Sequence, residues 1–456
     1  MTQAATPIAW LEWAEASARA RERDRPILLL LETRWSRPSH AFARALEDDD
    51  IIPELVNAGF LAARIDAERR PDLADRYGFG DWPSVACLTP AGALLGGAAG
   101  TSPPRLVDLL RSVDDAWRTR RADIEQAANS HQAHEPQEPQ EPREPVEPPD
   151  PPEPPEPPEP MEPMEPLLSD EIRLLLANES PAARAALDRL AADLVDPEDG
   201  GVFREPARGS RTAPAREKLL ATNADVLDLF THAGMVLGEP RYLDQARQIA
   251  SFVGVCFADP LGGFAASLMT DPPEVDATLY VDANARMVSA MVRAGAALDA
   301  PALTEAAIAS LERVVLATYR PGDGAGHVCD DPDLRGLLVD QIWLAEALMD
   351  AHEATGREPY EMLAAELLHY SVRVLWDAKG GGFFDRAEPA HPVKPFALNC
   401  RAVRTLRRGA EVCGEPVFAE WAGATLEGLG RAPRVQGGDA AALGLALLDA
   451  GVTGPT

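Results

Sequence analysis

A segment of prolines and acidic residues divides this 456-residue chain into two unlike parts. Between residues 135 and 166 an acidic residue recurs at almost every third position beside proline, as in EPPEPPEPMEPMEP. Proline fixes the φ angle and has no N–H to donate, so such a segment joins neither a helix interior nor a central strand. We expect residues 123–166 to form an extended polyproline II linker with its carboxylates along one edge. A ligand for a proline-binding groove is the alternative.

The residues before this linker show mixed strand and helix signals. The apolar runs PILLLLE and FLAARID predict buried strands, and WPSVACLTPAGALLGGAAG predicts a hairpin that turns at residues 90–92. Helices are expected over residues 8–23, 40–58, 70–78 and 106–118. The order of strand, helix, strand, helix, hairpin and helix is that of an α/β thioredoxin fold, which we assign to residues 1–122.

Residues 167–456 are predicted to be almost entirely helical. In LLVDQIWLAEALMDAHEATG apolar residues recur at helical steps on more than one side, and about eleven segments share this pattern. A glycine-rich turn before an aromatic residue or histidine occurs four times, as DPEDGGVF, ADPLGGF, RPGDGAGH and WDAKGGGFF. Its spacing of about 60 residues suits helix pairs, which stack into an open solenoid or close into an (α/α) toroid. Periodicity alone does not separate the two.

Charge and composition exclude several classes of function. A net charge of −30 argues against a nucleic-acid partner and against docking on anionic membranes, because both need clustered cations. No apolar run reaches the roughly 18 residues of a membrane-spanning helix, and the first residues do not read as a signal peptide. The five cysteines are far apart and form no C-x-x-C pair, so we expect free thiols and a cytoplasmic protein.

Several motifs in the expected order resemble the spermatogenesis-associated protein 20 family, also known as thioredoxin domain-containing proteins. FLAARIDAERRPDL and GFGDWPSVACLTPAG resemble its thioredoxin-like part. AREKLLATNADVL and the run from DQIWLAEALMDAHEATG to WDAKGGGFFD resemble its helical part. The resemblance implies a thioredoxin-like domain joined to an (α/α)6 toroid of the six-hairpin glycosidase type. This chain looks like a divergent and shortened member.

The redox corner of that family is degenerate here. Its C-H-W-C-H segment falls on residues 36–40, so both cysteines are replaced, by Ser36 and Ser39, while His40 remains. Disulfide exchange needs a thiolate, which serine cannot supply, so we expect no thioredoxin-type activity. We expect a serine here to cap the following helix rather than to act as a nucleophile with His40. Pro83 matches the family's proline, usually cis, and with Trp35 and Trp82 it forms either a recognition patch or ordinary packing.

In the helical part, polar residues recur near the starts of alternate helices. Such residues either cap or bond helices or line a central pocket. Sugar chemistry needs two carboxyl groups on either side of a bond, and the candidates are Glu217, Asp282 and Asp340. Further candidates for lining a pocket are Lys218, Asn223, Asn284, Asn399 and Asp439. In the family motif that AREKLLATNADVL resembles, a histidine and a tyrosine–aspartate pair are typical. This chain has Ala215, Ala221 and Thr222 at those three positions.

Two functions remain open from the sequence. The first is a redox-inactive binding or scaffold protein with a sugar-like small molecule or a protein as its partner. The second is a carbohydrate-active enzyme, a glycoside hydrolase or a sugar epimerase, that works in the toroid. No spacing typical of a metal site and no phosphate-binding loop is visible, so no cofactor is expected. The sequence does not set the oligomeric state.

Overall fold

A computed structural model describes residues 7–124, 169–205, 215–270, 273–387, 393–431, 435 and 437–451. The predicted linker, residues 123–166, lies almost wholly outside this described part. The chain forms two compact units. The first comprises residues 1–30, 42–64 and 84–164, and the second comprises residues 31–41, 65–83 and 165–456.

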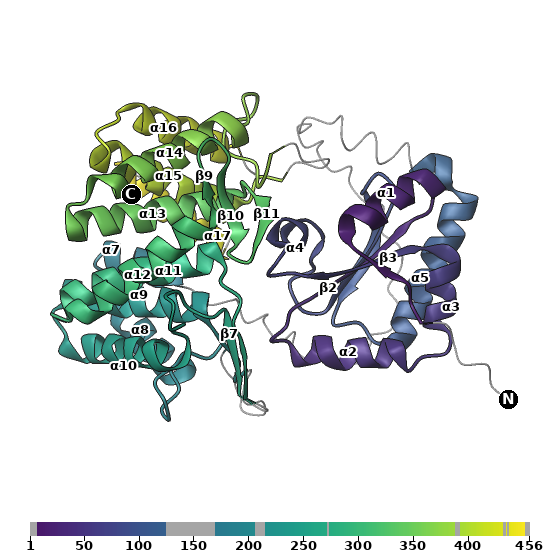
Figure 1. Cartoon of the computed structure of the whole chain (residues 1–456), viewed down its shortest axis with the longest axis horizontal. Coiled ribbons are helices and arrows are strands. Elements are labelled where there is room, and N and C mark those ends of the chain that lie inside the picture. The colour runs from purple at the N-terminus through teal and green to yellow at the C-terminus, as the bar shows by residue number, and fades with distance from the viewer. Residues whose placement is uncertain are drawn as a thin grey trace, which may run out of the picture. The chain divides into compact units, whose positions relative to one another are not determined.

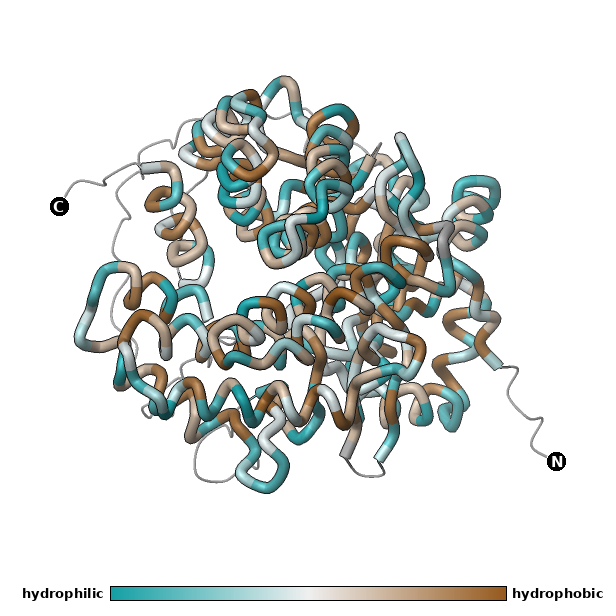
Figure 2. Tube along the Cα trace, turned by 60° about the vertical axis from the view of Figure 1, so that its left-hand side comes forward, coloured by the Kyte–Doolittle hydropathy of each residue, from teal (hydrophilic) through white to brown (hydrophobic). Residues whose placement is uncertain are grey.

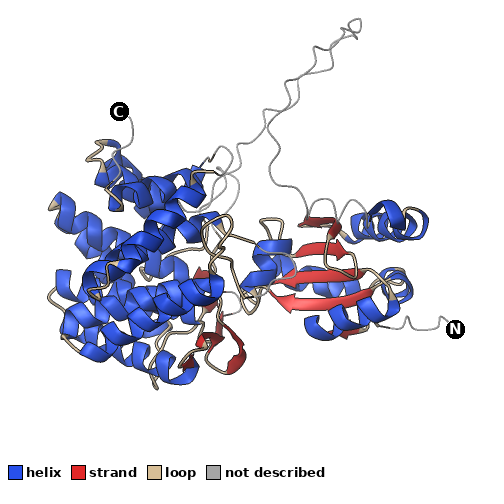
Figure 3. Ribbon diagram, turned by 90° about the horizontal axis from the view of Figure 1, so that it is seen from above, coloured by secondary structure: helices blue, strands red, loops and turns tan. Residues whose placement is uncertain are grey.

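A five-stranded sheet with the order β1-β3-β2-β4-β5 organises the N-terminal residues (Figure 1). Its strands are β1 (Trp10–Leu11), β2 (Ile27–Glu32), β3 (Leu61–Asp66), β4 (Ser84–Leu88) and β5 (Leu94–Ala99). The helices among them are α1 (Trp13–Arg23), α2 (Arg37–Glu47), α3 (Ile52–Gly59), α4 (Pro71–Tyr77) and α5 (Pro103–Thr119). Figure 3 shows the strands in red with helices beside the sheet.

The structure confirms most of the predicted order and corrects two elements. The single helix predicted over residues 40–58 is two helices, α2 and α3, with residues 48–51 between them. The β4–β5 hairpin turns at residues 89–93, as expected. Residues 10–11 were predicted to be helical but form strand β1, which pairs in parallel with Ala62 and Ala63 of β3. The edge of β3 offers backbone hydrogen bonds that a helical N-terminus would leave unmade. The core beneath the sheet is apolar and includes Leu28, Leu30 and Leu110.

The helical part closes into a ring. In the described residues six inner helices each contact the next, and the last contacts the first. They are α7 (Ser169–Ala177), α9 (Leu220–Leu237), α11 (Val281–Ala297), α13 (Leu338–Thr355), α15 (Phe396–Val412) and α17 (Gly437–Asp449). Outer helices pack against them: α8 (Ala182–Leu194), α10 (Pro240–Cys256), α12 (Pro301–Thr318), α14 (Glu358–Leu375) and α16 (Val417–Leu429). The closed ring is the toroid alternative rather than the open solenoid.

Two small sheets interrupt the predicted all-helical part. One has the order β6-β7-β8 and the other β11-β10-β9. Their strands are β6 (Lys218–Leu219), β7 (Ser267–Thr270), β8 (Pro273–Asp276), β9 (Tyr319–Arg320), β10 (Gly324–Val328) and β11 (Asp331–Arg335). These strands are two to five residues long, too short to show a strand period in the sequence.

Burial follows the position of each helix in the ring. The inner helix α13 is buried on several sides, with Leu338, Ile342, Leu344 and Leu348 all at most 1% exposed, as predicted. Figure 2 shows polar and apolar residues alternating along the helices. None of the described helices combines the length and apolar content needed to cross a membrane.

Candidate ligand-binding site

The degenerate redox corner is a helix start. Ser36 Oγ accepts a hydrogen bond from the backbone N–H of Ser39 at 3.2 Å, which is the N-cap bond expected for α2. Ser36 and Ser39 are 3% and 1% exposed. The backbone N–H of the half-buried His40 donates to the Ser36 carbonyl. Two buried hydroxyls, one of them engaged in capping, do not form an accessible nucleophile.

The aromatic neighbourhood of this corner is packed inside the second unit. Trp35 is 6% exposed, and the guanidinium of Arg204 stacks on its ring at 4.5 Å. The Trp82–Pro83 peptide bond is cis, as the resemblance implies, and Pro83 is buried. Ordinary packing therefore describes Trp35 and Pro83 better than an exposed recognition patch does.

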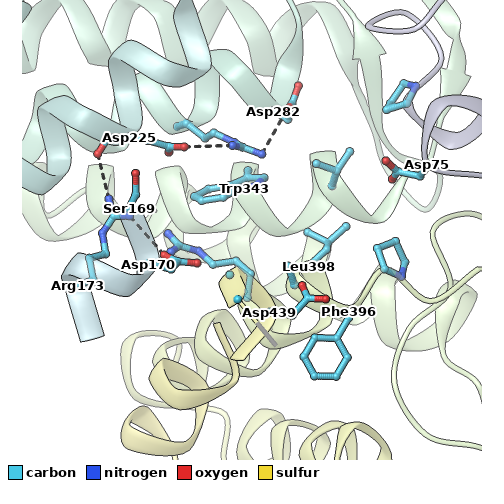
Figure 4. A pocket seen from close by; sticks show the side chains of 18 of the residues that line it. Asp75, Ser169, Asp170, Arg173, Asp225, Asp282, Trp343, Phe396, Leu398 and Asp439 are labelled. Atoms are coloured by element: carbon cyan, nitrogen blue, oxygen red, sulfur yellow. Dashed lines mark hydrogen bonds and ion pairs between the residues drawn. The ribbon is translucent and has the colours of Figure 1, made fainter. Parts of the chain in front are cut away.

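The first two turns of the six inner helices converge on one cavity of about 890 Å³, which we call the first-turn cavity. Figure 4 shows its side chains. Among the predicted residues, Asp282 of α11 and Asp439 of α17 line it. The other charged and aromatic residues in its wall are Asp75, Asp170, Glu171, Arg173, Asp225, Arg286, Trp343, Phe396 and Arg401.

Two arginines cover Trp343 in the wall of this cavity. The guanidinium groups of Arg286 and Arg401 lie 4.3 and 4.1 Å from its ring. Arg286 is held loosely, by Asp225 at 3.6 Å and Asp282 at 3.8 Å, and its Nε has no partner. Arg286 therefore has the longest ion pairs of the three arginines that line this cavity.

Ion pairs connect five of the inner helices, and two of the arginines in them also line the cavity. Arg173 of α7 pairs with Asp228 of α9, which also binds Arg293 of α11. Arg293 reaches Glu346 of α13, and Glu346 in turn binds Arg401 of α15 at 2.5 Å. These arginines outweigh the effect of burial on both carboxyl groups, so the pKa of Asp228 is well below its usual range and that of Glu346 is lowered to about 2.

Three predicted pocket residues have their side chains on the glycine-rich turns instead. The amides of Asn223, Asn284 and Asn399 each accept a hydrogen bond from a turn backbone N–H, at Val202, Phe264 and Phe383 respectively. Gln341 does the same at Ala325. Each of these amides also donates to the carbonyl four residues earlier in the chain. We call these four residues the amide clamps.

Lys218 and Glu217 lie outside the residues that line the first-turn cavity. The ammonium group of Lys218 is fully buried and bonds Asp196 at 2.8 Å and Asp199 at 2.6 Å. The carboxyl group of Glu217 lies 3.9 Å from Arg204. The geometry does not bring Glu217 together with Asp282 and Asp340 in one cluster.

Asp340 is fully buried and belongs to a cluster with Asp282 and His327. His327 Nδ1 lies 2.9 Å from one oxygen of Asp340, whose carboxylate also accepts the backbone N–H of Asp282. Burial disfavours the charged form of both His327 and Asp340. The Asp340 carboxylate nevertheless raises the pKa of His327 to about 9, while burial raises that of Asp340 to about 6.

Sequence reasoning missed His327, Arg286, Arg401 and Trp343. A signal for His327 was present, because it ends the one glycine-rich motif of the four that does not end in phenylalanine. The two arginines and the tryptophan carry no such mark. Each lies two positions from an amide clamp on its own helix.

Comparison with known proteins supports the two-part architecture. Residues 1–134 match the family model Thioredox_DsbH, described as a protein of unknown function, DUF255. A relative from Caenorhabditis elegans, uncharacterized protein B0495.5, is 28% identical over 99 residues, which is 20% of this chain and 14% of that protein. The chain thus covers well under two thirds of the length of this relative.

Solved structures share the fold of the helical part. D-mannose isomerase aligns with a TM-score of 0.50 at 15% identity, over 57% of this chain and 73% of that one. The GH76 α-mannanase BT2949 of Bacteroides thetaiotaomicron aligns with a TM-score of 0.50 at 13% identity, over 62% and 82%. The chain therefore has a small α/β thioredoxin-like part followed by an (α/α)6 toroid of the six-hairpin glycosidase type.

Proposed function

We propose that this protein is a redox-inactive binding protein whose toroid takes a neutral, sugar-like small molecule in the first-turn cavity. The observation that carries the proposal is the convergence of six helix starts on one cavity of about 890 Å³. That volume lies within the range of pockets for small molecules. The thioredoxin-like part is, in this proposal, a divergent relative of the spermatogenesis-associated protein 20 family that has lost its redox cysteines.

Charge balance favours a neutral ligand. Six carboxyl groups and three guanidinium groups line the cavity, which leaves an excess of three negative charges from side chains. Each helix N-terminus contributes roughly half a positive charge, so six of them offset that excess. A cavity with balanced charge and many donors and acceptors suits a polyol better than a sugar phosphate or a cationic amine.

A carbohydrate-active enzyme is the second candidate. Asp282 and Asp439 are two carboxyl groups in the wall of one cavity, as acid–base chemistry on a sugar requires. The engagement of Asp340 by His327 and the loose pairing of Asp282 with Arg286 favour binding over turnover. The shared fold with a mannose isomerase and an α-mannanase does not decide between the two.

Titration calorimetry of the full chain with neutral hexoses and disaccharides tests the proposal. We expect one sugar to bind and to stabilise the protein against heat, by about 2.7 kcal/mol at 100 times its dissociation constant. Asp439→Asn should weaken binding, because it removes an acceptor from the cavity wall. Asp449→Asn is the matched control, since Asp449 is at the other end of α17 and pairs with Arg404.

The results separate the candidates. Binding without conversion of the sugar, as followed by mass spectrometry, supports a binding protein, whereas conversion that Asp439→Asn abolishes supports the enzyme. Tighter binding of sugar phosphates than of neutral sugars would contradict the charge argument. A cytoplasmic location belongs to the same proposal, because all five cysteines are free thiols.

A further inference from the structure

Three groups of the kind that bind metal ions meet beside the first-turn cavity. Asp282 is in the first turn of α11, His327 in strand β10 and Asp340 in the first turn of α13. One nitrogen or oxygen of each lies within 4.8 Å of the others. They are 45 and 13 positions apart in the sequence, so they match none of the usual short motifs for metal binding.

The hydrogen bonds of His327 place a hydrogen on one ring nitrogen, Nε2, and direct the other, Nδ1, at a carboxylate. Nε2 lies 2.8 Å from the backbone carbonyl of Glu68, and a carbonyl only accepts, so Nε2 carries a hydrogen. Nδ1 lies 2.9 and 3.1 Å from the two oxygens of Asp340. A hydrogen on Nδ1 satisfies this contact, and so does a metal ion that both the imidazole and the carboxylate bind. Histidines that bind metals typically donate their other N–H to such a carbonyl.

We propose that Asp282, His327 and Asp340 bind a divalent transition-metal ion, Mn²⁺ or Zn²⁺. Two carboxylates and a neutral imidazole suit either ion and balance its charge. Two ligands about 2.1 Å from an ion are about 3 Å apart in an octahedral site, which suits Mn²⁺, and about 3.4 Å apart in a tetrahedral site, which suits Zn²⁺. The Nδ1–Oδ1 distance in the pair is 2.9 Å.

An ion at this position can be reached from solvent. The side chain of Asp282 is 19% exposed and lines the first-turn cavity, whereas His327 and Asp340 are 2% and 0% exposed. The protein therefore supplies ligands from one side, and the coordination positions on the cavity side are left for water or a ligand. The metal proposal stands on this geometry and does not depend on the binding of a sugar.

Calorimetry on the full chain, stripped with EDTA and dialysed, tests this site with Zn²⁺ and Mn²⁺ in separate titrations. We expect one ion of at least one metal per chain, with the bound metal confirmed by elemental analysis. His327→Gln and Asp282→Asn should each weaken binding at least about tenfold. His369→Gln is the matched control, because it removes a histidine that faces another carboxylate, Glu415 at 2.7 Å, and it should bind as the unchanged protein does.

Circular dichroism shows whether each variant folds. If the variant of the buried His327 does not fold, Asp282→Asn still tests the site, because the side chain of Asp282 is partly exposed. Failure of the folded full chain to bind either ion overturns the proposal and leaves a proton between His327 and Asp340. Undiminished binding by both Asp282→Asn and His327→Gln overturns it as well, because the ion would then bind elsewhere. Neither result bears on sugar binding by Asp439.

Discussion

At the scale of single residues, two serines that replace the redox cysteines have different structural roles. Ser36 Oγ accepts the backbone N–H of Ser39, whereas the buried Ser39 Oγ has no hydrogen-bond partner. The sequence supports the prediction of a helix cap here, because a serine precedes Arg-Pro at a helix start. It does not indicate which hydroxyl is engaged, since that depends on the packing of the corner.

Replacing each serine by alanine separates the two roles. Ser36→Ala should lower the free energy of unfolding by about 1 kcal/mol, because α2 loses its cap. Ser39→Ala should leave the free energy of unfolding nearly unchanged or slightly raised, because the buried Ser39 hydroxyl makes no hydrogen bond that the variant could lose. Urea denaturation of the two variants measures both. Equal losses in the two would show that the capping bond does not stabilise α2.

At the scale of elements, the inner helices use neighbouring positions for different purposes. Residues two apart on a helix point about 200° from each other. Asn223, Asn284 and Asn399 clamp the turns, and two positions later Asp225, Arg286 and Arg401 line the cavity. The recurrence of polar residues at helix starts was thus readable from the sequence. The side of each helix that faces the axis was not, because closure of the ring sets it.

The amide clamps should contribute strongly to stability. Asn284→Ala leaves the buried N–H and carbonyl of Phe264 without partners. We therefore expect a loss of about 2–4 kcal/mol in the free energy of unfolding. Asn178→Ala is the matched control, because the exposed Asn178 bonds only a carbonyl of its own helix and should change stability by less than about 0.5 kcal/mol. Similar losses in both would contradict a role for the clamp.

At the scale of the whole molecule, the ring depends on charged groups that its periodic pattern does not reveal. The apolar repeats predicted about eleven helical segments, and the turn spacing predicted that these segments are paired. Neither shows that the centre holds ion pairs such as Arg293–Glu346 and Arg293–Asp350. These partly buried ion pairs join residues 53 and 57 positions apart, and the closed ring brings them together.

These ion pairs predict a loss of stability in acid. Burial works against the ionised form of Glu346, but Arg401 and Arg293 outweigh it and lower the pKa to about 2. A lowered pKa in the folded state stabilises the protein above the unfolded value, near 4.3, and that contribution is lost as the pH falls toward 2. The loss should be on the order of 3 kcal/mol for this group.

Urea denaturation of the full chain between pH 6 and pH 2 measures this dependence. Glu346→Gln should be less stable near neutral pH by about 3 kcal/mol, because Arg401 loses the carboxylate that it binds. Its stability should also fall less steeply in acid. Glu353→Gln is the matched control: its carboxyl group is on the same helix and also binds an arginine, Arg408, but it is 54% exposed. This control should follow the unchanged protein, since exposed pairs contribute little. A slope for Glu346→Gln as steep as that of the unchanged protein would mean that the central ion pairs do not determine acid stability.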